Sequence, residues 1–216
     1  MKILSFSYCF PNQFNPNWGV FIAQRLSAFS TIENIDLEVC SPIPKFPIFS
    51  NFKSRIPPKL EENRGLRVYH PTYFYIPKVL KFLDGKFYAQ GLYGWVYNYC
   101  KNKKPHIFDA HFAWPDGVGV YYLSQRLRIP YTITLRGWIW IGLKQPMLWN
   151  QAVVALKNAE AVICLCRSMA EICKQIGCKE ERLHIIHNGV NRKLFFPFDK
   201  VRARTDLGLP LNKRIV

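Results

Sequence analysis

The sequence predicts an α/β protein in which a parallel sheet carries helices on both of its faces. Two observations support this fold class. Short apolar runs of strand length alternate along the chain with segments whose apolar residues recur at helical spacing. The chain is also 216 residues long and 49% hydrophobic, which is enough for a sizeable core and excludes disorder as its main state.

The apolar runs and the helical spacing place each element in order. Strands are expected at residues 2–8, 35–41, 66–70, 106–112, 130–135, 161–166 and 182–187. Helices are expected at residues 19–29, 78–103, 117–127, 147–158, 169–176 and 201–207. Strands that are separated by helices form a parallel sheet. Residues 42–65 carry several prolines and are expected to be irregular.

Helix ends are marked by residue types that satisfy free backbone groups. Asp116 stands where it would cap the helix at 117–127, although a catalytic acid is the alternative. Ser168 and Glu171 have the spacing of a capping box, and Gly177 ends the helix that they would open. Residues 212–216 look like a strand that is only beginning, so the chain is expected to be cut off.

Several classes of protein are excluded. No window approaches the ~18 uncharged apolar residues of a membrane span, and the opening residues lack a cleavable signal. Seven scattered cysteines indicate reduced thiols, and Cys164-x-Cys166 has no second pair, so no metal site is expected. The sequence has no G-x-G-x-x-G motif and no phosphate-binding lysine loop. Nor does it assemble a Ser-His-Asp triad, a nucleophilic cysteine motif or paired carboxylates.

The formal net charge of +16 suggests an anionic partner. Nucleic-acid phosphates and anionic lipid both attract such a surface. Aromatic and basic residues gather at 45–59 and 137–149, a combination that favours a membrane–water interface. The alternative is that these aromatic residues belong to the core and the lysines are simply solvated.

Polar, glycine-bearing loops follow several of the predicted strands. In a parallel sheet the carboxyl ends of the strands meet at one edge, where ligands bind. Gly19 would let the backbone approach a ligand closely, which alone is a weak signal. His111 ends a strand beside an acidic loop, where it would orient or deprotonate a hydroxyl or serve as a structural histidine.

Four segments, in order along the chain, resemble motifs of family 4 glycosyltransferases. They are the F-P to G-V-F loop at 10–21, F-D-A-H-F-A-W-P-D-G at 108–117, I-P-Y-T-I-T-L-R-G at 129–137 and H-I-I-H-N-G-V-N-R-K-L-F-F-P at 184–197. The resemblance implies an α/β, Rossmann-like N-terminal half of a two-domain GT-B enzyme. Residues 1–198 would be this acceptor-side domain, and 199–216 the interdomain linker and the start of a truncated C-terminal donor domain.

The resemblance also implies a reaction and a set of site residues. Such enzymes move a sugar from a nucleotide-sugar to an acceptor hydroxyl with retention of configuration, usually without a metal and here with no cofactor expected. His111 matches the catalytic histidine beside the transferring sugar. Gly19, Asn188 and Gly189 match donor-proximal positions. The acceptor side would comprise Asp109, Trp114, Asp116, Arg136 and Trp138.

Two positions depart from the family pattern. Asp109 replaces the first histidine of an H-x-H stretch, and Arg136 with the following Trp138 replaces an H-G-x-D stretch. Both changes fall on the acceptor side, so an atypical acceptor is expected. Arg136 would bind an acidic or phosphorylated acceptor, or it forms a structural ion pair.

The leading hypothesis is therefore a glycosyltransferase half acting at the cytoplasmic face of a membrane on a glycan or lipid-linked acceptor of surface polysaccharide or lipopolysaccharide type. Because the donor-binding residues would lie in a second half, the chain alone is expected to be inactive. A non-catalytic docking subunit of a split enzyme is the second hypothesis. A nucleic-acid-binding protein is a remote third, since charge alone suggests it and no recognition motif is present.

Overall fold

The computed structural model describes residues 1–45, 57–76, 81–137, 139 and 142–215 of the chain. The strands are β1 (Lys2–Phe6), β2 (Asp36–Cys40), β3 (Ile43–Lys45), β4 (Leu60–Asn63), β5 (Leu66–Tyr69), β6 (Thr72–Phe74), β7 (Ile107–His111), β8 (Tyr131–Thr134), β9 (Ala161–Cys164) and β10 (Leu183–Ile185). The α-helices are α1 (Val20–Ser30), α2 (Asp84–Lys103), α3 (Val118–Leu127), α5 (Pro146–Asn158), α6 (Arg167–Gln175) and α7 (Lys200–Asp206). Short helical turns lie at Lys81–Leu83, Ala113–Gly117 and Glu180–Arg182.

Eight strands form the main sheet in the order β10-β9-β8-β7-β1-β2-β5-β4. All neighbouring pairs are parallel except β4 and β5. From β1 the chain first moves to β2 on one side and later returns to β7 on the other. The strand order therefore reverses between β1 and β7, which is the place where an open parallel sheet forms its ligand crevice.

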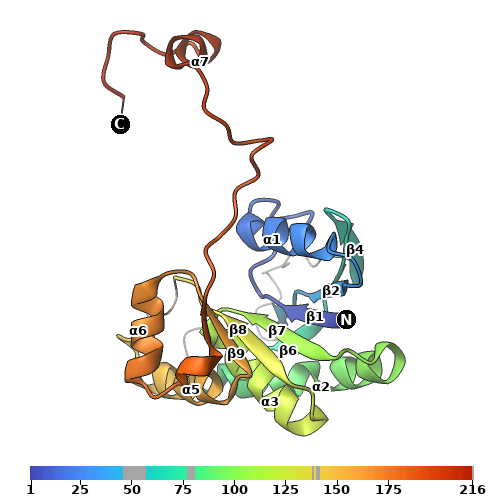
Figure 1. The fold of residues 1–216 in the computed structure, drawn as a ribbon. Helices are drawn as coiled ribbons and strands as arrows, with labels where there is room; N and C mark the ends of the chain where they lie inside the picture. Colours follow the sequence, from blue (N-terminus) through green and yellow to red (C-terminus); the bar gives the residue numbers. More distant parts are fainter. Residues whose placement is uncertain (46–56, 77–80, 138, 140–141, 216) are drawn as a thin grey trace.

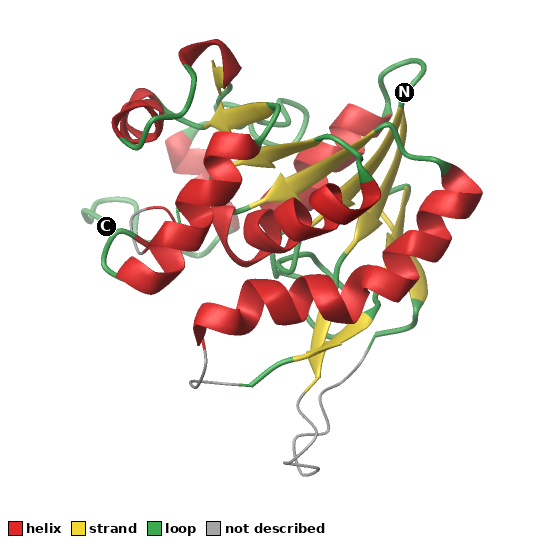
Figure 2. Ribbon diagram, turned by 90° about the horizontal axis from the view of Figure 1, so that it is seen from below, coloured by secondary structure: helices red, strands yellow, loops and turns green. Residues whose placement is uncertain are grey.

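Helices cover both faces of this sheet, which confirms the predicted fold class. One core lies between the sheet and α1, and it includes Ile22, Leu26 and Val39. The larger core lies on the opposite face, where residues of α2, α3, α5 and α6 pack against the strands. Figure 1 shows α1 above the sheet and α2, α3 and α5 below it. Figure 2, seen from below, shows helices in front of the strands.

The region from 42 to 65 is more regular than its prolines suggested. β3 pairs with β6 in a separate two-stranded sheet, where Pro44 is tolerated because the sheet has only two strands. β4 pairs with β5 as an antiparallel hairpin. Its turn is Arg64-Gly65, and both residues have positive φ, as a two-residue hairpin turn requires. Residues 46–56, which include most of the basic aromatic stretch at 45–59, lie outside the described residues.

Both predicted N-terminal helix caps are wrong, whereas Gly177, with φ of 87°, does follow the end of α6 as predicted. Asp116 caps nothing, because the chain already turns helically at Ala113–Gly117 and Gly117 stands at the cap position of α3. α6 likewise begins after Cys166, two residues before the expected start, so Ser168 lies within its first turn and no side chain caps it. The strongly amphipathic sequence of α6 makes tertiary packing of Met169 and Cys173, rather than the capping box, the source of its stability.

All seven cysteines are free, as expected, and five of them are buried. Within the described ranges, no helix is both long and apolar enough to cross a membrane. After β10 the chain leaves the sheet, passes beside α1 and continues to α7 (Figure 1). Residues 186–215 are almost entirely exposed, and residues 212–215 form no strand.

Gly119 offers a test of how tightly α2 and α3 pack. A Cβ at Gly119 would lie 2.2 Å from the Tyr88 ring, so we expect Gly119→Ala to lower the free energy of unfolding by about 1–3 kcal/mol through overpacking. Gly94 is the matched control, because a Cβ there meets nothing within 4 Å. Gly94→Ala should raise the free energy of unfolding by about 0.5–1 kcal/mol. Urea denaturation measures both, and equal effects of the two changes would contradict this packing.

Candidate functional site

Four predicted site residues meet at the carboxyl edge of the sheet, next to the point where the strand order reverses. Asp109 and His111 lie two residues apart on β7 and therefore point to the same face, which is the face covered by α1. The intervening Ala110 points into the opposite core. Arg136 follows β8 by two residues, and Asn188 follows β10 by three.

The four side chains form a continuous polar chain. Arg136 donates through Nη1 to Asn188 Oδ1 at 2.9 Å and through Nη2 to His111 Nδ1 at 3.3 Å. His111 Nε2 lies 3.1 Å from Asp109 Oδ2. Because the guanidinium can only donate, His111 Nδ1 is the acceptor in this pair. The proton of a neutral His111 ring therefore sits on Nε2, facing Asp109.

Asp109 is held as a carboxylate. Burial would raise the pKa of Asp109, but the charge of His111 and hydrogen bonds from His111, Ser5 and Thr132 outweigh it and bring the pKa to about 2. The Ser5 hydroxyl donates to Oδ2 at 3.0 Å and the Thr132 hydroxyl to Oδ1 at 3.1 Å. These two hydroxyls come from β1 and β8, the strands on either side of β7. Asp109 thus connects β1, β7 and β8 through side-chain hydrogen bonds below the site.

His111 and Arg136 are both buried, and burial shifts both of their pKa values downward. For His111, burial and the nearby charges of Arg136 and Arg25 lower the pKa, although Asp109 opposes the shift. For Arg136, burial and then the charge of Arg25 lower the pKa to about 10. At neutral pH the pair is therefore a neutral imidazole against a cationic guanidinium. His111 is fully buried in this arrangement.

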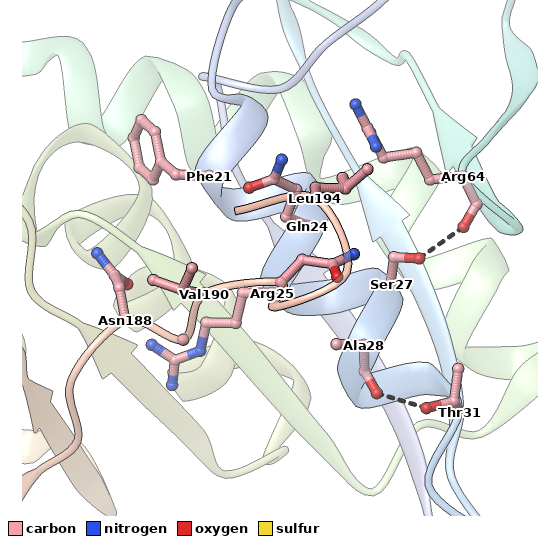
Figure 3. Close-up of a pocket in the computed structure, with 12 residues that line it drawn as sticks. Phe21, Gln24, Arg25, Ser27, Ala28, Thr31, Arg64, Asn188, Val190 and Leu194 are labelled. Atoms are coloured by element: carbon pink, nitrogen blue, oxygen red, sulfur yellow. Dashed lines mark hydrogen bonds between the residues drawn. The ribbon is translucent and has the colours of Figure 1, made fainter. Parts of the chain in front are cut away.

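A cavity of about 440 Å³ lies beside this polar chain, between the outer face of α1 and residues 188–194 (Figure 3). Asn188 belongs to both, since it lines the cavity and accepts from Arg136. The Phe21 ring lines the cavity and lies 5.1 Å from the Arg136 guanidinium carbon. The lining residues are Phe21, Gln24, Arg25, Ser27, Ala28, Thr31, Arg64, Asn188, Gly189, Val190, Asn191 and Leu194.

Sequence reasoning missed the side of this cavity that α1 supplies. Phe21, Gln24, Arg25 and Ala28 follow one helical stripe, opposite the buried positions of α1. A polar stripe on a helix normally faces solvent, so the pattern carried no sign that another segment would lie across it. Arg64 reaches the same cavity from the hairpin turn between β4 and β5.

Of the two glycines expected near the donor, Gly189 lines the cavity and Gly19 does not. Gly19 precedes α1 with φ of 71°, and a Cβ there would lie 2.1 Å from the carbonyl oxygen of Cys9. The chain's own backbone thus requires a glycine at this position. Gly189 lines the cavity, and a Cβ there would meet nothing within 4 Å.

Two other expected residues, Asp116 and Trp114, do not line the cavity. Asp116 is fully buried, and its Oδ1 accepts from the Tyr8 backbone N–H at 3.0 Å and from the Tyr88 hydroxyl at 2.9 Å. Burial raises the pKa of Asp116 well above its usual range, despite these two bonds. Trp114 is half-buried and packs against the larger core. Trp138 lies outside the described residues. No group of three or more His, Cys, Asp or Glu suited to a metal occurs in the part of the chain that the structure describes.

Comparison with solved structures defines the class of this fold. A sucrose-phosphate synthase from Thermosynechococcus elongatus matches with a TM-score of 0.67 at 14% identity, over 97% of this chain and 53% of that one. Anabaena HepE in complex with UDP-glucose matches with a TM-score of 0.61 at 17% identity, over 96% of this chain and 50% of that one. The fold is that of the N-terminal half of a GT-B glycosyltransferase.

Sequence comparison then gives the family. The profile described as Glycosyltransferase Family 4 matches residues 48–194, and the chain therefore belongs to this family. A candidate teichuronic acid biosynthesis glycosyltransferase of Bacillus subtilis (strain 168), TuaC, is 26% identical over 227 residues, covering 100% of this chain and 57% of that protein. The chain spans about half the length of the relatives it matches.

The buried His111 predicts a measurable acid sensitivity. Its folded pKa is lowered, chiefly by burial, whereas an unfolded histidine titrates near ~6.5. Below that pH the unfolded chain binds a proton that the folded chain does not, so stability falls as pH falls. Asp109 adds nothing between pH 7 and 5, because its carboxyl titrates at lower pH. We expect His111→Gln to flatten the slope of unfolding free energy against pH in this window.

The control is His184→Gln, which removes an exposed histidine from β10. Urea unfolding at several pH values between 5 and 7 gives the slope for each protein. A slope in His111→Gln as steep as in the unmodified chain would show that this ring is not held neutral by burial.

Proposed function

We propose that this chain is the acceptor-side half of a retaining family 4 glycosyltransferase, which moves a sugar from a nucleotide-sugar to a hydroxyl of a glycan or lipid-linked acceptor. Its membership of the family supports the reaction class. The observation that carries the assignment of a site is the polar chain Asp109–His111–Arg136–Asn188 at the carboxyl edge, next to a cavity. The relation to TuaC favours an acceptor from surface polysaccharide biosynthesis.

Within this proposal, His111 is the catalytic residue beside the transferring sugar. Asp109 holds the Nε2 side of the ring, and Arg136 covers Nδ1. A substrate hydroxyl that displaces the Arg136 Nη2 donor would meet a neutral imidazole, which is the protonation state that can accept a proton. Asn188 and Gly189 lie on the segment that leads from the sheet, on the side where the donor would approach, with Gly19 at the start of α1.

The donor itself would bind mainly to the half of the relatives that this chain does not span. Anabaena HepE, whose structure was solved with UDP-glucose, is about twice as long as the matched region. Transfer requires donor and acceptor to be held in attack geometry, and that positioning carries much of the rate. On this proposal, the chain alone binds the acceptor and lacks most of the binding site for the donor.

We expect the 216-residue chain alone to show no turnover above background with labelled nucleotide-sugars and lipid-linked or glycan acceptors. The positive control is the product of the reading frame continued past Val216 or, where the frame stops there, the chain mixed with the product of the adjacent gene. In the active form, His111→Ala should lower transfer by about 10²–10⁴-fold. Turnover by the chain alone at a rate similar to that of the positive control would contradict the proposal that a second half is needed to bind the donor.

A second candidate function is a non-catalytic docking subunit of a split enzyme. Exposed aromatic side chains on the segment after β10 favour it, because Phe195 and Phe196 are 62% and 59% exposed. In that case residues 188–197 form the interface with a separate donor-binding subunit. Co-purification of such a subunit, and its loss when both phenylalanines are changed to serine, would distinguish this function from that of a covalent half.

We further propose peripheral attachment to the anionic cytoplasmic face of a membrane. The charge of +16 supports it, as do exposed aromatic–cation pairs such as Lys101 over Tyr97. In the aromatic stretch at 137–149, which was expected to favour a membrane–water interface, Trp149 is half-buried against the core, and Trp138 and Trp140 lie outside the described residues.

Flotation with liposomes tests the attachment. We expect the chain to float with phosphatidylglycerol-containing vesicles at low salt and to dissociate at high salt, because surface attraction is screened. Neutral phosphatidylcholine vesicles are the control. Absence of binding to anionic vesicles at both salt concentrations would exclude a membrane surface as partner of this chain.

A further inference from the structure

We propose that Arg25, with Arg136 behind it, forms a subsite for an oxyanion carried by the acceptor, a carboxylate or a phosphate, in the cavity between α1 and residues 188–194. This inference rests on the proposed function and names a chemical class for its acceptor. Three features of the described residues carry it: buried guanidinium donors without acceptors, a local excess of positive charge, and the shape of the cavity.

Two guanidinium N–H groups are buried and lack a hydrogen-bond partner among the described residues. They are Nη1 of Arg25 and Nε of Arg136. Arg136 is only 2% exposed, and its other two nitrogens are already used by Asn188 and His111. A buried cationic donor without an acceptor is costly, and a structure normally supplies an acceptor. An oxyanion in the cavity would supply an acceptor for Arg25, and its charge would also offset that of Arg136, which does not itself line the cavity.

The surroundings of the two arginines carry more positive than negative charge. Arg25 is close enough to Arg136 and His111 to act on both electrostatically. The carboxylate of this group is Asp109, and both of its oxygens already accept hydroxyl hydrogen bonds. Of the described residues that line the cavity, Arg25 and Arg64 are charged and none is acidic. Two like charges close together in a partly buried site are stabilised by a nearby anion.

The cavity also has the size and chemistry to hold a sugar unit. Its volume of about 440 Å³ lies within the usual range for small-molecule sites, roughly 300–1,000 Å³. The Phe21 ring offers an apolar surface, and Gln24, Ser27 and Asn191 offer groups for hydroxyls. In Figure 3, Arg25 extends from α1 toward the segment that carries Asn188 and Val190. Arg25 lines the cavity and is half-buried, and its Nη1 is shielded from solvent.

A histidine at position 136 would change its charge on titration, and its side chain would be shorter than that of arginine. Arg136 is instead a permanent cation at the place where the resemblance to the family leads one to expect histidine. Its guanidinium is fixed by Asn188 on one side and by the Phe21 ring on another. The departure from the expected family pattern and one of the two unpartnered donors therefore fall on the same residue, Arg136, whose partner Asn188 lines the cavity.

Equilibrium binding by the 216-residue chain tests the subsite without requiring transfer. The probes are glucuronate and inorganic phosphate, with glucose as the neutral control and calorimetry or NMR titration as the readout. We expect glucuronate or phosphate to bind at least 10-fold more tightly than glucose. Arg25→Gln should lower that affinity by at least 10-fold. The tighter of the two oxyanions identifies carboxylate or phosphate as the acceptor group.

The matched control is Arg126→Gln, which removes one exposed arginine from α3 on the opposite face of the sheet. It should bind both oxyanions as the unmodified chain does, and a melting temperature for Arg25→Gln close to that of the unmodified chain shows that the fold is intact. Equal affinity of Arg25→Gln and the unmodified chain overturns the proposal. So does Arg25-dependent binding of UDP that competes with glucuronate, because the anion would then belong to the donor. Since no transfer is measured, inactivity of the enzyme would leave this result standing.

Discussion

The candidate site of this protein is organised around one buried positive charge, the guanidinium of Arg136. Arg136 follows β8 into the carboxyl edge of the sheet, where it is only 2% exposed. A buried guanidinium must be surrounded by acceptors, and it takes two of them from β7 and from the segment after β10, through His111 and Asn188. His111 in turn rests on Asp109, which is fixed by hydroxyls of β1 and β8. One buried cation thus connects four parallel strands at their functional edge.

The topology of the sheet explains why this edge is available. The chain moves outward from β1 in one direction and later fills the other side from β7 onward. Right-handed crossovers then place α1 on one face and α2, α3, α5 and α6 on the other. Of the helices in the described ranges, α1 is the one that packs on this face, close to the reversal point. The polar side chains of β7 project to that face, and the segment after β10 crosses it beside α1 to enclose the cavity.

The solved structures that share this fold are only 14% and 17% identical to the chain. At such low sequence identity the proteins share the fold, whereas the chemistry of the site depends on the residues that this chain places there. Asp109 and Arg136, the two positions at which the sequence was expected to depart from the family pattern, lie on opposite sides of His111. Both act on the pKa of this imidazole, which Asp109 raises and Arg136 lowers.

Most of the elements of the main sheet and their order could be predicted from local sequence patterns. Burial repeats every two residues in a strand and every three or four in a helix, so a short window reveals both. The parallel sheet, the helices on both faces and the polar strand ends all followed from such windows. The hairpin of β4 and β5 was missed because prolines dominated its surroundings, although the Arg64-Gly65 turn signal was present. Asp116 was misplaced because a local capping pattern concealed its long-range partners, Tyr8 and Tyr88.

Which side chains meet could not be predicted in this way, because the contacts join distant parts of the chain. The Arg136 contacts with His111 and Asn188 span 25 and 52 residues of sequence. They depend on strand register and on the rotation of elements against one another, neither of which a local pattern records. Arg25 is the clearest case. In the sequence it is an ordinary arginine on the outer stripe of a helix, whereas in the fold its Nη1 is buried beside a cavity that residues 188–191 and Leu194 also line.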